Sequence, residues 1–96
     1  MNESNEKKEI DPWTTVRQRY TVGQVVTGTV TRIVPFGVFA RIEDGIEGLI
    51  HLSELPSWMN PIQNLHEGQR LPLRILFIDA ERHRLALSLR QADNVN

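Results

Sequence analysis

A chain of 96 residues, 40% of them hydrophobic, can form one domain with a packed core but is too short for two. The absence of cysteine excludes disulfides and thiolate metal sites, and it suits a reducing compartment. The net charge is -1, from 11 Lys and Arg against 12 Asp and Glu, which argues against a protein that holds nucleic acid by phosphate charge alone.

Both ends of the chain are polar, and the expected domain lies between them. We expect residues 1–19 to be a largely disordered linker, residues 20–90 to form the domain, and residues 91–96 to be a short tail. Residues 14–20, where the linker meets the domain, could form a short helical turn with Val16 and Tyr20 on one face. No apolar run approaches the roughly 20 residues that span a bilayer, so we expect a cytoplasmic protein with no membrane segment.

The first half of the domain alternates apolar and polar residues, which indicates β-strands. Strands are predicted over residues 24–34, 38–43 and 47–52, with a hairpin turn at Asp44-Gly45 between the last two. The residues expected to face the core are Val26, Gly28, Val30, Val38, Ala40, Ile42, Ile50 and Leu52.

The second half begins with a segment that loses the alternation. Asn60 and Pro61 are typical of a helix start and Gly68 of a helix end, so one short helix is predicted between them. Strands follow over residues 69–78 and 85–90, with Leu71, Leu73, Ile75, Leu85, Leu87 and Leu89 facing inward. Short antiparallel strands with one small helix between the third and the fourth predict a small closed barrel, which leaves no exposed sheet edges.

Three residues on the predicted outer face could contact unpaired bases. Phe39 points away from the core, and an outward aromatic ring can stack on a base, although Phe39 could instead pack beneath residues 53–67. Phe36 precedes the same strand and could flank the same patch or plug one end of the barrel. His51 could stack on a base or bond its edge, or be an ordinary surface histidine.

Two charged residues near the last turn could add polar contacts. The Arg84 guanidinium is suited to a phosphate, while Asp79 could accept from a base amino group or orient Arg84. The alternative is a surface ion pair worth roughly 0–1 kcal/mol.

Motifs for catalysis are missing from the sequence. It has no glycine-rich phosphate loop and no nucleophile elbow, and its three histidines lack the spacing of metal ligands. We therefore expect no enzymatic activity, no metal and no cofactor.

Five motifs occur in an order and spacing that point to one family: Gly23-x-Val25-x-x-Gly28-x-Val30, Phe36-Gly37-Val38-Phe39, Gly45-Ile46-Glu47-Gly48-Leu49-Ile50-His51-x-Ser53-Glu54-Leu55, Gly68-Gln69, and Ile78-Asp79 followed by Arg84-Leu85-Ala86-Leu87-Ser88-Leu89. Together they resemble the ribosomal protein S-one RNA-binding domain over nearly the whole of residues 20–90. The stretches Asp11-Pro12-Trp13 and Tyr20-x-Val22-Gly23 also resemble the junction before a repeat in the ribosomal protein itself.

This resemblance implies a five-stranded antiparallel Greek-key OB-fold barrel that binds single-stranded RNA on one face. The family's contact residues would fall on Phe36, Phe39, His51, Asp79 and Arg84. The implied function is mRNA binding in translation by a monomeric module, with the ribosome or sibling repeats in tandem as further partners.

One departure from the family pattern keeps other functions open. Many repeats carry Lys or Arg in the loop after Ser57-Trp58, whereas here neither occurs between Arg41 and Arg70. Some repeats of the family dock proteins, so the alternative is a protein-docking repeat that anchors a larger assembly, with a footprint around Trp58 and Met59. A third alternative is an accessory domain of an exonuclease.

Overall fold

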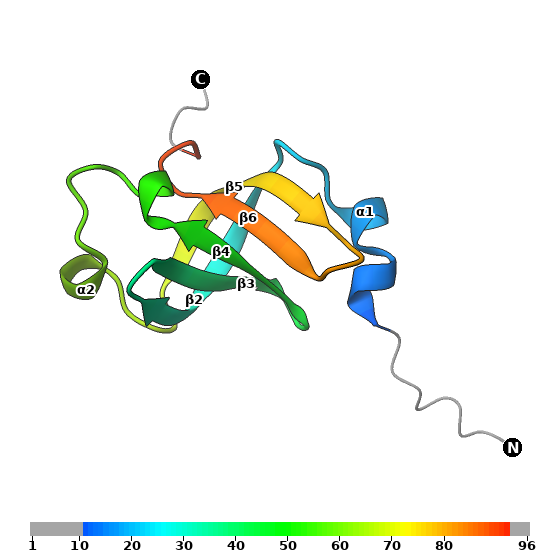
Figure 1. The fold of residues 1–96 in the computed structure, drawn as a ribbon, viewed down its shortest axis with the longest axis horizontal. Helices are drawn as coiled ribbons and strands as arrows, with labels where there is room; N and C mark the ends of the chain where they lie inside the picture. The colour runs from blue at the N-terminus through cyan, green and yellow to red at the C-terminus, as the bar shows by residue number, and fades with distance from the viewer. Residues whose placement is uncertain (1–10, 93–96) are drawn as a thin grey trace, which may run out of the picture.

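The computed structural model describes residues 11–92, which form a closed five-stranded β-barrel with the strand order β2-β3-β4-β6-β5 (Figure 1). The strands are β2 (Val25–Val34), β3 (Gly37–Glu43), β4 (Ile46–His51), β5 (Arg70–Asp79) and β6 (Arg84–Ser88). Each predicted strand is therefore present, with bounds that differ by no more than two residues at either end. The five-stranded OB-fold barrel is confirmed.

The barrel is mixed rather than wholly antiparallel. Four neighbouring pairs are antiparallel, but β4 and β6 run parallel, with Leu49 opposite Ala86 and Ile50 opposite Leu87. Strand direction can alternate all the way round a closed ring only when the number of strands is even. With five strands one pair must be parallel, so the prediction of an antiparallel barrel needed this correction.

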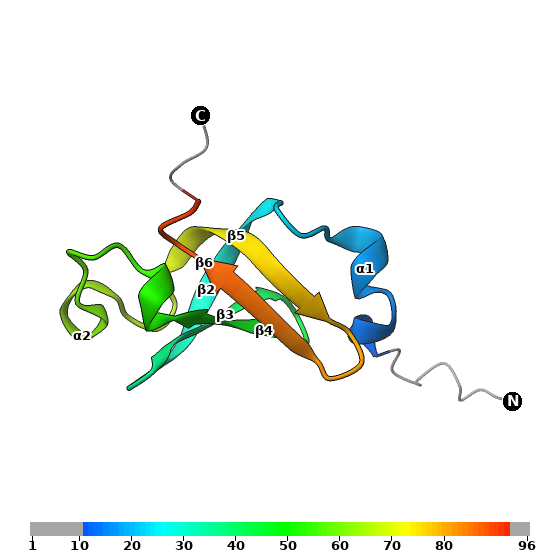
Figure 2. The same ribbon diagram turned by 45° about the horizontal axis from the view of Figure 1, so that its top comes forward.

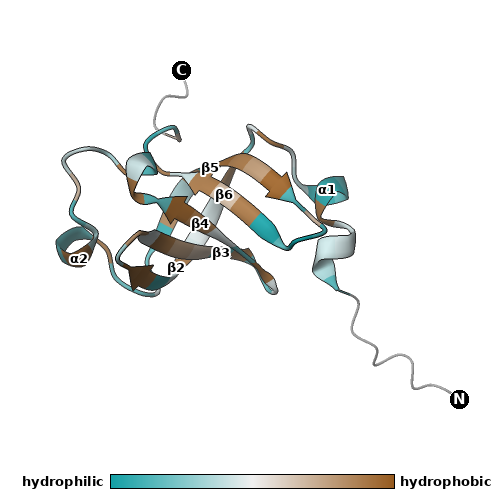
Figure 3. Cartoon of the chain, in the orientation of Figure 1, coloured by the Kyte–Doolittle hydropathy of each residue, from teal (hydrophilic) through white to brown (hydrophobic). Residues whose placement is uncertain are grey.

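The inward positions of the strands make the core, as the alternation predicts. Figure 3 shows the brown, hydrophobic residues gathered on the strands. Leu52 is the exception among the predicted core residues: β4 ends at His51, and Leu52 begins the 3-10 helix η2 (Leu52–Glu54), where its side chain is exposed. The fully buried core residues of the strands are Val30, Val38, Ala40, Ile46, Ile50, Leu73, Ile75 and Leu87.

The packed unit begins before Tyr20. A 3-10 helix η1 (Pro12–Thr14) and a helical turn α1 (Val16–Arg19) lie at the end of the barrel that carries the β5–β6 turn (Figure 2). Trp13 is only 5% exposed, Val16 is fully buried, and the indole Nε1 of Trp13 donates to the carbonyl of Gly45 at 3.0 Å. Residues 12–19 are thus part of the packed domain and not of a linker, while the expectation for residues 1–10 lies outside the described residues.

At the other end of the barrel lies the predicted short helix, α2 (Pro61–Asn64) (Figure 1). The side chain of Asn60 accepts from the backbone N–H of Ile62 at 3.0 Å, which is the N-cap contact that the sequence predicts. The helix presents Ile62 to solvent, and Trp58 just before it is also exposed. Within residues 11–92, the helices are all too short to carry the chain across a bilayer.

Ser88 is a buried polar residue that alternation places on the outer face. Its hydroxyl donates to Glu54 Oε1 at 2.7 Å and accepts from the backbone N–H of Gln91 at 2.9 Å. These two bonds tie the end of β6 to η2 and satisfy a hydroxyl that has no access to water.

The substitution Ser88→Ala is therefore expected to lower the free energy of unfolding by about 1–2 kcal/mol, because the backbone N–H of Gln91 loses its acceptor and Glu54 Oε1 loses one of its donors. Urea denaturation of the purified domain measures the loss. Ser57→Ala, in an exposed loop, serves as the control and is expected to change stability by no more than about 0.5 kcal/mol. Equal effects of the two variants would contradict a structural role for the Ser88 hydroxyl.

Candidate nucleic-acid interface

One face of the barrel is hollowed into a groove of about 700 Å³. The groove brings together four of the five predicted contact residues, from elements that are distant in sequence: Phe36 from the β2–β3 turn, Phe39 from β3, His51 from the end of β4 and Arg84 from the start of β6. The fifth residue, Asp79, does not line it. A groove that runs across several strands is suited to an extended ligand.

Two aromatic rings form one wall of this groove. The rings of Phe36 and Phe39 lie edge to face, with centroids 6.2 Å apart and planes at 86°. Phe36 is 50% exposed and Phe39 is half-buried, and neither belongs to the core cluster. This geometry leaves ring surface accessible from the groove, although contact with a base remains a prediction.

The close approach of β3 to β4 holds this wall in place. Gly37 pairs with His51, and a Cβ added at Gly37 would lie 2.3 Å from the carbonyl oxygen of Ile50. The backbone N–H of Leu52 also donates to the carbonyl of Phe36 at 3.1 Å. A glycine is thus required where the turn that carries Phe36 rests against the end of β4.

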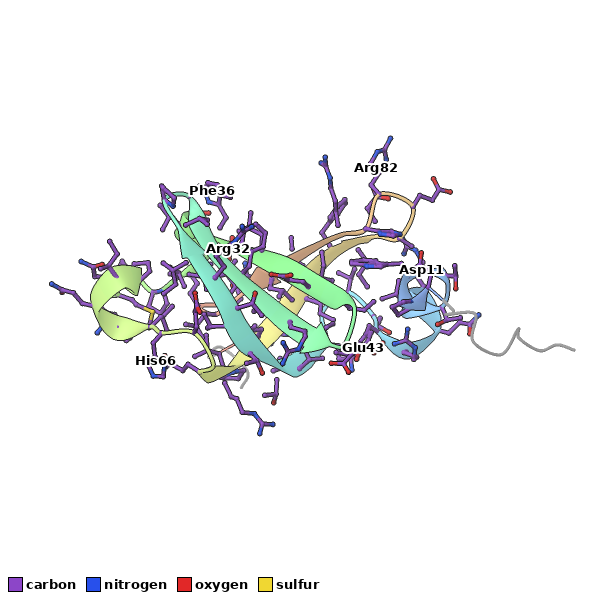
Figure 4. The ribbon with its side chains drawn as sticks, turned by 90° about the horizontal axis from the view of Figure 1, so that it is seen from below. Asp11, Arg32, Phe36, Glu43, His66 and Arg82 are labelled. Carbon is purple, nitrogen blue, oxygen red and sulfur yellow. The ribbon has the colours of Figure 1, made fainter. Side chains whose placement is uncertain are left out.

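Arg32, which contacts the groove wall at Phe39 without lining the groove itself, was missed in the sequence. Its guanidinium lies 4.8 Å from the centroid of the Phe39 ring, a cation–π contact. Strict alternation would turn Arg32 inward with Val30, but the β2–β3 register shifts between these two residues, so Arg32 pairs with Phe39 on the outer face. Figure 4 shows Arg32 and Phe36 on the same side of the barrel, opposite His66 and Glu43. The signal that could have found it is Ile33, an apolar residue where the alternation of Val26, Gly28 and Val30 calls for a polar one.

The ring of His51 is oriented by its neighbour. The backbone N–H of Ser53 donates to His51 Nδ1 at 3.1 Å, and the Ser53 hydroxyl lies 3.0 Å from the same nitrogen. Because Nδ1 accepts, the proton of the neutral ring is on Nε2, which leaves an N–H donor for a ligand.

Arg84 and Asp79 are paired in the β5–β6 register but have different surroundings. Asp79 accepts from the backbone N–H of Arg82 at 3.2 Å and from its guanidinium at 3.0 Å, and this side-chain hydrogen bond lowers the pKa of Asp79 below its usual value. Asp79 thus holds the β5–β6 turn. Among residues 11–92, no carboxylate lies within ion-pair distance of Arg84, which leaves its charge available to an anion.

The groove carries little net charge. Arg84 lies on one side, while Glu47 and Glu54 line the same groove. Glu47 accepts from the Thr31 hydroxyl, and Glu54 is bonded to Ser88. Within the described residues no group of three or more His, Asp or Glu side chains is placed to hold a metal ion. The arrangement offers apolar and aromatic contact with a few polar groups.

Phe77, on β5, also lines this groove and was likewise missed. The alternation of Leu71, Leu73 and Ile75 places it inward, yet it is half-exposed because the β5–β6 register shifts between Ile75 and Phe77.

Comparison with known proteins identifies the family of this chain. The family model described as "S1 RNA binding domain" matches residues 19–90. The chain is 45% identical over 85 residues to the small ribosomal subunit protein bS1 of Mycolicibacterium smegmatis, covering 86% of this chain and 18% of that protein. It is thus similar to one segment of a relative that is several times longer.

Solved structures share the fold. The solution structure of GSP13 from Bacillus subtilis superposes with a TM-score of 0.71 at 28% identity, over 81% of this chain and 62% of that one. A chain in the crystal structure of the a/eIF2alpha-aDim2p-rRNA complex from Pyrococcus horikoshii OT3 gives a TM-score of 0.69 at 33% identity, over 75% of this chain and 45% of that one.

Proposed function

The chain belongs to the S1 RNA binding domain family, and from that membership we propose that it binds single-stranded RNA in the groove of Phe36, Phe39, His51 and Arg84 without catalysing a reaction. The observation that carries this proposal is the edge-to-face pair of phenylalanines on the groove wall. Every base has an aromatic face, so accessible rings bind single strands whatever their sequence, whereas a duplex hides those faces.

Base stacking supplies most of the proposed affinity. A base that stacks on the face of Phe39 now covered by Arg32 displaces the guanidinium, which is then free to contact a phosphate. Phe36 offers a second ring beside it, and the Nε2–H of His51 can donate to a base edge. Arg84 holds a phosphate. Asp79 acts indirectly, because it stabilises the β5–β6 turn that leads into Arg84 at the start of β6.

The affinity of one such module should be low. Two stacked bases contribute about 1–3 kcal/mol each, and with a phosphate contact or two the sum barely exceeds the roughly 4 kcal/mol of a millimolar complex. Useful affinity would come from tandem copies through effective concentration. The bS1 relatives are ribosomal proteins by name, and this chain spans less than a fifth of the length of those it matches. We therefore propose mRNA binding in translation, in the cytoplasm, with the ribosome or sibling repeats as partners.

The most direct test of this proposal compares single-stranded RNA with its own duplex. Fluorescence anisotropy of a labelled oligonucleotide is expected to rise on titration with the protein, and annealing the complementary strand is expected to reduce that binding. Equal affinity for both forms would refute recognition through exposed base faces.

Salt should weaken the binding only slightly. Each phosphate neutralised on a single strand contributes about 0.7 to the slope of log K against log salt, so two arginines predict a slope between about -1 and -2. Titrations at several KCl concentrations measure it. A slope of about -4 or steeper, which corresponds to six or more ions released, would contradict a groove that binds through stacking.

Docking of a protein is the second candidate function, and one observation favours it. Trp58 is 73% exposed and Ile62 is 82% exposed, and both lie outside the groove. A partner bound there would leave the groove residues unaffected, which separates this candidate from RNA binding in any experiment that resolves single residues.

A further inference from the structure

Phe77 faces the groove because a bulge turns it out of the core. Leu71, Leu73 and Ile75 are buried, and continued alternation would bury Phe77 as well. The register shift after Ile75 gives the next core position to Ile78, which is buried, and leaves the ring of Phe77 50% exposed. A large apolar ring is thus exposed to solvent within the groove. The fold forgoes the stabilisation that burying this ring would have contributed.

Strand pairing places this ring in line with the first aromatic wall. Arg32 pairs with Phe39, Phe39 with Leu49, Leu49 with Ala86, and Ala86 with Phe77. These partners form one row across all five strands of the barrel. Neighbouring strands are about 4.8 Å apart, so the three steps from Phe39 to Phe77 span roughly 14 Å along the sheet.

The residues between Phe39 and Phe77 in this row, Leu49 and Ala86, form the floor of the groove. Leu49 and Ala86 line the groove, and neither belongs to the core cluster. Arg84 is two residues from Ala86 on β6, where Leu85 and Leu87 are buried, so Arg84 lies on the outer face beside this floor. Among the described residues, Arg84 is the only arginine or lysine that lines the groove, and it lies beside the path between the two aromatic positions. An RNA chain that crosses from one position to the other would pass its phosphates beside this guanidinium.

We propose that Phe77 is a second stacking platform and that single-stranded RNA crosses the strands from Phe36 and Phe39 to Phe77, passing Arg84. This inference rests on the proposed function, since it assigns the same groove a second anchoring point. It implies that the site has a length requirement: an oligonucleotide that covers only the first wall gains nothing from Phe77.

The test measures binding of oligouridines of about two to ten nucleotides, a range that includes the smaller sites of OB folds. Phe77→Ala is expected to weaken the longer oligonucleotides by about 5- to 150-fold and to leave the shortest unchanged. Phe77→Leu, which keeps an apolar side chain but removes the ring, should show the same length dependence, while Phe77→Tyr should bind as the wild type does. Trp58→Ala removes an exposed aromatic outside the groove and is the matched control.

The outcomes separate this inference from the function on which it rests. If Phe77→Ala and Phe77→Leu match Trp58→Ala at every length while loss of Phe36 and Phe39 abolishes binding, Phe77 is not a platform and the proposed function stands. If the wild type binds none of the oligonucleotides, both proposals are refuted. Circular dichroism of each variant verifies the fold, and should Phe77→Ala unfold, Phe77→Leu decides the question.

Discussion

Replacing both Phe36 and Phe39 with alanine is expected to remove detectable binding of single-stranded RNA and to leave the barrel folded. The two rings make one wall of the groove and contact each other edge to face. Loss of two stacked bases costs about 2–6 kcal/mol of binding free energy. A millimolar complex has only about 4 kcal/mol in total. Fluorescence anisotropy with a labelled oligonucleotide measures the loss.

The fold should survive because neither ring belongs to the core cluster. Thermal denaturation of the double variant verifies this. Phe36→Tyr with Phe39→Tyr keeps both aromatic faces and is expected to retain binding, while Trp58→Ala controls for the loss of an exposed ring elsewhere. A folded double-alanine variant with wild-type affinity would contradict the assignment of these residues to the RNA contact.

Gly37→Ala is expected to cause the largest loss of stability among the predictions made for this domain, about 3 kcal/mol. The new Cβ would lie 2.3 Å from the carbonyl oxygen of Ile50 and 3.2 Å from the Cα of His51. Both atoms belong to the backbone of β4, so the clash is relieved only if β3 and β4 move apart. A domain of this size has only a few kcal/mol of net stability, so a large fraction of the variant should be unfolded at room temperature.

Urea denaturation measures this loss directly. Arg41→Ala, on the exposed side of the same strand, introduces the same residue without a clash and is expected to change stability by no more than about 0.5 kcal/mol. RNA binding should fall with the folded fraction of Gly37→Ala, since only the folded barrel brings the groove residues together. Equal stability of the two alanine variants would show that β3 and β4 are less closely packed at this point than the structure indicates.

Periodicity in the sequence was enough to predict the barrel and the outward position of Phe39. Alternation over residues 38–43 places Val38 and Ala40 in the core and Phe39 outside, and the structure has all three in these positions. The N-cap at Asn60 was also predictable, because that contact is local. Structural features that depend only on residues close together in the chain could thus be predicted from the sequence.

The features that the sequence did not predict depend on contacts between distant segments. Bulges in β2 and β5 shift the alternation, so Arg32 and Phe77 face outward where strict alternation places them inside. Trp13 is buried because Gly45, 32 residues later, accepts its indole N–H. Ser88 is buried because Glu54 satisfies its hydroxyl. None of these partners can be identified from the pattern of a single strand.

The partners of Asp79 and Arg84, beside the groove, could not be predicted from the sequence either. The sequence placed both residues near the last turn and left open an ion pair between them. In the structure the carboxylate of Asp79 is bonded to Arg82, and Arg84 lines the groove without it. The choice of partner depends on the shape of the β5–β6 turn, which a residue pattern does not specify.

A titration with short single-stranded RNA, followed by ¹H–¹⁵N and aromatic ¹H–¹³C NMR, shows directly whether RNA binds in the groove. We expect the largest shifts at Phe36, Phe39, His51 and Arg84, with the ring proton signals of the two phenylalanines moving upfield, as stacking of a base above them causes. Shifts gathered around Trp58 and Ile62 with the groove signals unmoved, or no shifts at all, would contradict this expectation.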